Sequence, residues 1–139
     1  MKKIMLVLIT ITTIVSASWF QTDKKELKNH ENQMLKSTPF SQIQPQIGKE
    51  PMMIEFGSVS CQSCQVMGKI LFKIKQKYPK SNIYFLDIYK DMPTAKSFGI
   101  RMIPTQKYLD KDGNIADTHM GIIKQDEFEK KLKNLEIIR

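Results

Sequence analysis

The feature that most constrains this chain is a close pair of cysteines between two elements of regular structure. Cys61 and Cys64 are the only cysteines in the 139 residues. A short apolar run, Pro51–Phe56, precedes the pair and is typical of a central strand buried on both faces. Beyond the pair, apolar residues recur at three- and four-residue steps, which predicts one face of an amphipathic helix: Met67, Ile70, Leu71, Ile74 and Tyr78. The pair therefore lies at a strand-to-helix junction.

The rest of the pattern predicts a single α/β domain. Its later elements, in chain order, are a buried strand Ile83–Ile88, a short helix Pro93–Phe98, a strand Thr105–Leu109, a hairpin strand Ile115–Met120 and a helix marked by Phe128, Leu132 and Leu135. The first strand, the long helix and the next strand make a right-handed crossover unit. We expect a central mixed β-sheet flanked by helices on both sides.

The N-terminus predicts export. Residues 1–17 carry Lys2 and Lys3 ahead of an apolar run and end in small residues, which is the pattern of a cleaved signal peptide. The alternative is an uncleaved anchor, because apolar character continues weakly through Trp19 and Phe20 and the stretch is near the short limit for a membrane span. Both interpretations predict a periplasmic or other extracytoplasmic location for the rest of the chain.

Between this segment and the domain the chain is polar. Residues 18–36 are mostly polar and charged, and we expect a spacer or a surface helix there. Residues 37–139 then form the domain, whose length suits one compact core. Prolines and a glycine interrupt its first part, where Phe40–Ile43 is expected to form a short edge strand.

The positive charge does not predict a nucleic-acid partner. The formal net charge is +8, of which Lys2 and Lys3 contribute two. The other lysines are scattered, without the clustered basic and aromatic residues that nucleic-acid binding requires. A solvated basic surface is the better interpretation.

The placement of the cysteine pair favours redox chemistry. At the start of a helix, free backbone N–H groups and the helix dipole stabilise a negative charge, so Cys61 is expected to form a thiolate. Cys64 lies one turn further on and can close on Cys61 after Cys61 has formed a mixed disulfide. A bridge between residues so close in sequence constrains the unfolded chain little, so it is a poor structural staple. We therefore predict that Cys61 attacks and Cys64 resolves.

A metal site is the main alternative use of the pair. Structural zinc takes four protein ligands, and the chain adds only His30 and His119 without zinc-like spacing, so no metal ligand is assigned. Copper(I) stays open because thiolates and thioethers suit it, and the chain has nine methionines, Met67 and Met102 among them. Core packing explains Met67 better, since it lies on the apolar helix face.

Taken together, the ordered motifs resemble the thioredoxin superfamily over about residues 51–135. They are the strand before the pair, Cys61-Gln62-Ser63-Cys64, Phe98-Gly99-Ile100, Ile103-Pro104-Thr105, the Asp112-Gly113 turn and Gly121. The resemblance implies the thioredoxin fold and a thiol:disulfide oxidoreductase that needs no bound cofactor. It also implies that the Ile103–Pro104 bond is cis and faces the dithiol, and that Ile103 offers backbone groups to an extended substrate.

The resemblance also suggests a proton carrier. Members of the family often have a buried acid in the strand before the cysteines, and Glu55 occupies that place. Burial of an ionisable group is costly, so one hypothesis is that Glu55 carries a proton to and from Cys64. The alternatives are that Glu55 reaches the surface or pairs with a lysine.

Residues around the pair differ from those of thioredoxins and should tune its potential. Ser60 replaces the usual tryptophan, and Gln62-Ser63 lacks the histidine of strongly oxidising relatives. We expect a monomer that reduces disulfides of exported proteins, apocytochrome c among the possible clients, and that a membrane electron donor re-reduces. The alternatives are a disulfide oxidase or isomerase, and a copper-binding or copper-delivery protein.

Overall fold

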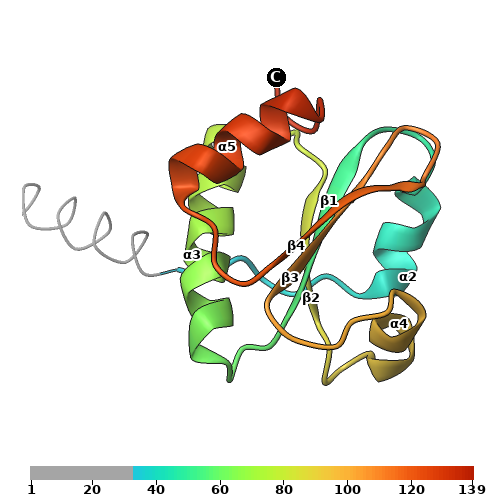
Figure 1. Ribbon diagram of the computed structural model, residues 1–139, viewed down its shortest axis with the longest axis vertical. Coiled ribbons are helices and arrows are strands. Elements are labelled where there is room, and N and C mark those ends of the chain that lie inside the picture. The colour runs from blue at the N-terminus through green and yellow to red at the C-terminus, as the bar shows by residue number, and fades with distance from the viewer. Residues whose placement is uncertain (1–32) are drawn as a thin grey trace, which may run out of the picture. The chain divides into compact units, whose positions relative to one another are not determined.

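The computed structural model describes residues 33–139 (Figure 1). The predicted signal or anchor and most of the predicted spacer lie outside the described residues, while residues 33–36 are not helical. Within the described range, no helix combines the length and the apolar character needed to cross a membrane.

A mixed four-stranded sheet organises the described part of the chain, with strand order β2-β1-β3-β4. Strand β1 (Met52–Gly57) is parallel to β2 (Ile83–Asp87) and antiparallel to β3 (Thr105–Leu109). The hairpin strand β4 (Ile115–Met120) completes the sheet beside β3. The predicted order of the elements along the chain from β1 onward, and the mixed character of the sheet, are confirmed.

Helices cover both faces of the sheet. Helices α3 (Gln62–Lys77) and α5 (Gln125–Asn134) lie on one face, and α2 (Phe40–Ile43) and α4 (Met92–Ser97) on the other (Figure 1). A short 3₁₀ helix, Gln44–Gln46, follows α2. Every residue of β1 is buried, because alternate side chains enter the two cores on either side of the sheet. The thioredoxin fold predicted from the sequence is the fold observed.

The prediction of an edge strand at Phe40–Ile43 is wrong, because this segment is helix α2. The amide of Gln42 bonds the carbonyl of Pro39 at 2.9 Å, which starts a helical turn. The turn buries Ile43 completely and leaves its polar neighbours exposed. The pattern of only four residues does not distinguish such a helical turn from a short strand. The sheet edge is contacted instead by Ser37, which forms a parallel bridge with Phe85.

The segment before α2 is fastened to the domain at two places. The Leu35 N–H donates to the carbonyl of Gly68 in α3 at 2.9 Å, and the Thr38 N–H donates to the carbonyl of Phe85 at 2.7 Å. Gly68 lacks a side chain because Met34 fills the space, so a Cβ there would overlap the Met34 side chain. Residues 33–38 are thus an integral edge of the fold.

Candidate active site

Cys61 stands at the start of α3, as predicted. A short loop joins the end of β1 to Cys61, which is the N-cap residue of the helix. Its Sγ accepts the Cys64 backbone N–H at 3.4 Å and lies 3.2 Å from the Ser63 Oγ. An N-cap side chain normally satisfies a free N–H of the first turn, and here a sulfur does so. The helix therefore directs its donors at the Cys61 sulfur.

The two thiols occupy different environments. Both cysteines are reduced; Cys61 is partly exposed, whereas Cys64 is fully buried. Partial burial raises the pKa of Cys61, but hydrogen bonds from Cys64 and Ser63 outweigh it and bring the pKa below its ordinary value. Burial raises the pKa of Cys64 to about 12, and its hydrogen bond to Cys61 acts in the same direction. Cys61 is thus the accessible and more acidic thiol, and Cys64 is the buried partner that keeps its proton.

Of the three residues predicted to tune the pair, Ser63 contacts the Cys61 sulfur directly. Ser60 bonds Ser58 instead, through its Oγ at 2.9 Å and its N–H at 3.2 Å. The carbonyl of Ser58 in turn accepts the Cys61 N–H at 3.2 Å, so Ser60 shapes the loop that carries the cysteine. Gln62 begins the helix with an exposed side chain.

The Ile103–Pro104 bond is cis, which confirms the prediction. The pairing of Thr105 with Phe56 sets the start of β3 beside the end of β1, from which the cysteine loop departs. The carbonyl of Pro104 accepts the Gly121 N–H at 2.8 Å, and Ile103 is half-buried. Ile103 and Pro104 thus lie at the same end of the sheet as the cysteines.

Glu55 is fully buried in β1, so the alternative of a surface position is wrong. Its Oε2 accepts a hydrogen bond of 3.1 Å from Gln106 Nε2. The partner of Glu55 is therefore this amide and not the lysine of the other alternative. Burial raises the pKa of Glu55 to about 8; the Gln106 bond works to lower it, and the charge on Cys61 raises it. The carboxyl can therefore exchange a proton near neutral pH.

The sequence reasoning missed Gln106. It lies opposite Glu55 across the β1–β3 pairing and is fully buried. Its Nε2 also donates to the Gly121 carbonyl at 3.3 Å. An amide side chain at the second residue of the predicted strand Thr105–Leu109 was the available signal, because a buried polar side chain requires a partner.

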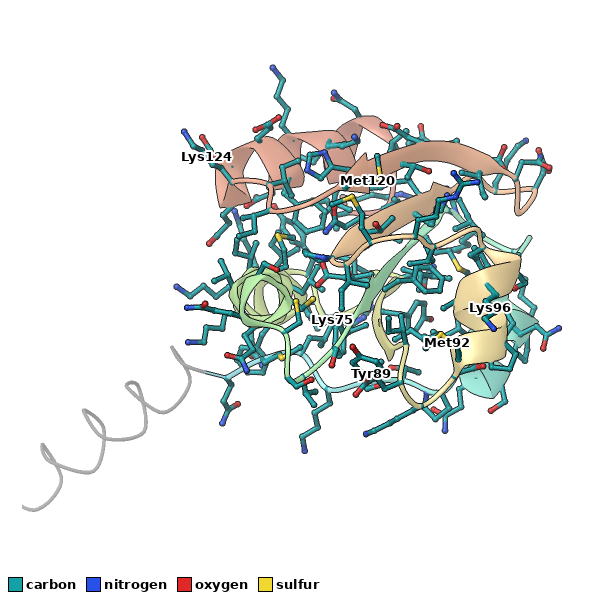
Figure 2. The ribbon with its side chains drawn as sticks, turned by 60° about the horizontal axis from the view of Figure 1, so that its bottom comes forward. Lys75, Tyr89, Met92, Lys96, Met120 and Lys124 are labelled. Atoms are coloured by element: carbon teal, nitrogen blue, oxygen red, sulfur yellow. The ribbon has the colours of Figure 1, made fainter. Side chains whose placement is uncertain are left out.

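An exposed apolar rim borders the site. Val59 precedes Cys61 by two residues, Met102 precedes Ile103, and Met120 pairs with Thr105. With Ile122, these side chains keep between 51% and 61% of their surface exposed. Figure 2 turns toward the viewer the end at which α3 begins and shows Met120 on β4. Such a patch suits contact with another polypeptide.

The described residues contain no group of three or more histidine, cysteine, aspartate or glutamate side chains that could hold a metal ion. Met67, one of the methionines considered for copper, is fully buried. Its sulfur lies 3.4 Å from the Ile123 N–H, which donates to it. Met67 thus has the packing role that its helix face predicted.

Comparisons with known proteins agree with this geometry. The family model for the thioredoxin-like domain matches residues 41–136. The chain belongs to the thioredoxin-like family. Because this family membership is joined to a reduced Cys61–Cys64 pair at the start of a helix, the protein is a thioredoxin-like thiol:disulfide oxidoreductase.

Solved structures with the same fold include thioredoxins of two eukaryotes. A thioredoxin from Nicotiana alata is 22% identical, with a TM-score of 0.60, and the match covers 68% of this chain and 82% of that one. Mitochondrial thioredoxin 3 from Saccharomyces cerevisiae, in its oxidized form, is 24% identical, with a TM-score of 0.61 and coverage of 76% and 99%. No curated protein matches the chain.

Proposed function

We propose that this protein reduces disulfides of exported proteins outside the cytoplasm, with Cys61 as the attacking and Cys64 as the resolving thiol. The observation that carries the proposal is the contrast between the two sulfurs. Cys61 is partly exposed and its pKa is lowered, whereas Cys64 is buried and its pKa is raised. The accessible sulfur is therefore the one that ionises more easily, and the thiolate is the nucleophilic form.

The reaction follows from these two states. The Cys61 thiolate attacks a substrate disulfide; one substrate sulfur leaves as a thiolate and takes a proton from solvent, while the other stays joined to Cys61. Cys64 then loses its proton and attacks the Cys61 Sγ, which breaks the bond to the substrate and releases the second thiolate. The protein ends as the Cys61–Cys64 disulfide, and two electrons have passed to the substrate.

Glu55 is the base that we assign to the second step. The Cys64 thiol is too weakly acidic to ionise unaided near neutral pH, because burial raises its pKa to about 12. The charge of Glu55 acts on Cys64 and raises the Cys64 pKa, and the Glu55 pKa of about 8 suits a group that accepts and returns a proton. In the unliganded protein most of the Glu55 population is protonated at pH 7, so the rate of this step should rise with pH.

The surroundings of Cys61 support a polypeptide substrate. The apolar rim of Val59, Met102, Met120 and Ile122 offers side-chain contacts next to the reactive sulfur. The backbone of Ile103, beside the start of β3, is the group that we assign to pairing with an extended substrate segment. Exported proteins that carry a disulfide in an extended segment, apocytochrome c among the possible clients, fit this description.

The hydrogen bonds of Cys61 support a reductant over a disulfide oxidase or isomerase. The groups that lower the Cys61 pKa are side chains and amides of Ser63 and Cys64, with no cation among them in the described part of the chain. Strong oxidants owe their potential to a highly stabilised reduced form. A thiolate held by neutral donors is stabilised less, which favours a reducing couple.

The location and the electron source rest on the sequence. Lys2 and Lys3 with the apolar run behind them motivate export, with the chain cleaved or anchored. The exterior is oxidising, so a reductant there needs a membrane electron donor to restore the dithiol. We propose that the protein works as a monomer and needs no bound cofactor.

The deciding measurement is the reduction potential of the Cys61–Cys64 couple, obtained by equilibration against a thiol buffer of known potential. A potential of about −270 mV is expected, whereas a potential of about −120 mV would assign the oxidase function instead. Titration of the reduced protein with copper(I) tests the copper alternative, and tight stoichiometric binding would favour it. A reporter fused after residue 36 tests export, and a cytosolic signal would refute it.

A further inference from the structure

Gln106 lies between the buried carboxyl of Glu55 and the backbone of Gly121, which contacts Pro104. Its amide nitrogen donates one N–H to Glu55 Oε2 at 3.1 Å and the other to the Gly121 carbonyl at 3.3 Å. The Gly121 N–H in turn donates to the Pro104 carbonyl at 2.8 Å. The glutamine amide is therefore attached at one end to the buried carboxyl and at the other to the backbone that holds Pro104.

Gln106 is not explained by packing. It is fully buried in β3, where an apolar side chain would fill the same space without the loss of hydration that an amide suffers. Its Oε1 has no hydrogen-bond partner in the part of the chain that the structure describes. Burial of this amide is costly, and its two N–H groups are the only part of it that makes hydrogen bonds in residues 33–139, which points to a role for those groups.

The carboxyl that Gln106 contacts has two unlike oxygens. Oε2 is held by the amide, whereas Oε1 is buried and has no hydrogen-bond partner in residues 33–139. A buried polar atom without a partner is rare in folded proteins and is a feature of reactive groups. Of the two oxygens, Oε1 is thus the one available to take a proton.

We propose that Gln106 is a positioning residue for proton transfer, which holds Glu55 by Oε2 so that Oε1 receives the proton of Cys64. This inference rests on the proposed shuttle role of Glu55. When Cys64 attacks the mixed disulfide, its S–H bond breaks and the proton passes to Oε1 of the carboxylate. The electron pair stays on the Cys64 sulfur and forms the new bond to the Cys61 sulfur.

Gln106 also raises the fraction of Glu55 that is ionised at a given pH. An N–H donor stabilises the ionised carboxyl, and the Gln106 bond accordingly opposes the rise in the Glu55 pKa that burial causes. Other titratable groups on this side of the sheet come from every element packed there: Cys61 and Cys64 from the start of α3, Asp87 from β2, Tyr108 from β3, Asp117 and His119 from β4, and Glu127 and Lys131 from α5. Among them Cys61 acts on Glu55 directly, and it raises the pKa.

The test is Gln106→Met, which keeps the length of the side chain and removes both donors. We expect the Glu55 pKa, followed by NMR of the labelled carboxyl carbon, to rise by about one unit from its value of about 8. The carboxylate fraction at pH 7 then falls about tenfold, and so does the rate at which Cys64 resolves a preformed mixed disulfide. Raising the pH should restore that rate, because the carboxylate returns.

A matched control separates positioning from disturbance of the strand. Lys107→Met introduces the same side chain at the next residue of β3, on the opposite face of the sheet. It should leave both the Glu55 pKa and the pH–rate profile unchanged. A Gln106→Met protein with the unaltered Glu55 pKa, or an equal change in Lys107→Met, would overturn the proposal. If Gln106→Met does not fold, Gln106→Leu provides the same readout.

A double variant tests whether the two residues act together. In a protein that already carries Glu55→Gln, adding Gln106→Met should slow resolution no further, since no carboxyl remains to be positioned. Independent losses would overturn the proposal. Failure of the reductase assignment would give a different result. The reduction potential of the Cys61–Cys64 couple would then be strongly oxidising, but the rate of resolution would still depend on Gln106 through Glu55, because the same groups serve both directions of the reaction.

Discussion

Replacing Glu55 with glutamine should stabilise the protein at neutral pH much more than at pH 5. Glu55 is fully buried, and burial raises its pKa from an ordinary value of 4.5 to about 8. The glutamine has nearly the same shape as the protonated acid, and its oxygen can keep the bond from Gln106 Nε2. The substitution thus removes the ionisation of a buried group while it changes the packing little.

The size of the effect follows from the two pKa values. Because the pKa in the fold exceeds that in the unfolded chain, stability is full below pH 4.5 and is lost as the pH rises toward 8. At pH 7 the unfolded carboxyl is ionised and the folded one is mostly protonated, a penalty of about 3 kcal/mol. At pH 5 the penalty is only about 1 kcal/mol. Glu55→Gln should therefore gain about 2 kcal/mol more at pH 7 than at pH 5.

Urea unfolding of the reduced proteins at both pH values measures this difference. The exposed Glu50 supplies the control, since Glu50→Gln should change stability equally little at pH 5 and at pH 7. A gain that does not depend on pH would show that the Glu55 carboxyl ionises normally in the fold. Destabilisation at pH 7 would refute the reasoning from burial altogether.

Three further outcomes are expected. Cys61→Ser should abolish exchange and Cys64→Ser should trap a mixed disulfide, and faster alkylation of Cys64 than of Cys61 in the reduced protein would reverse their roles. Gly57→Ala should destabilise by about 1–3 kcal/mol, because the new Cβ would lie 2.8 Å from Phe85 Cε2, and it should alter the alkylation of Cys64, whose Sγ would be 3.3 Å away; unchanged stability in urea would contradict this close packing. Gly68→Ala should destabilise in the same assay, and Met34→Ala should recover part of the loss, since the two side chains compete for one space.

The main elements could be predicted because their signals are local. A short apolar run that only Glu55 interrupts marks β1, steps of three and four residues mark α3, and an Asp-Gly turn marks the β3–β4 hairpin. The position of Cys61 at a helix start followed directly, and with it the direction of its pKa. The short segment Phe40–Ile43 was assigned wrongly, since four residues fit a strand or one helical turn equally well.

The sequence by itself thus determined the order of the strands and helices from β1 onward, the cysteine pair and its chemistry, and the presence of an acid in a central strand. Only the tertiary structure decided what that acid contacts. Gln106 is 51 residues from Glu55, and the two meet because β3 pairs with β1 in one particular register. A shift by one residue would turn Gln106 to the other face of the sheet. Register arises from packing over the whole domain, so no local pattern in the chain reports it.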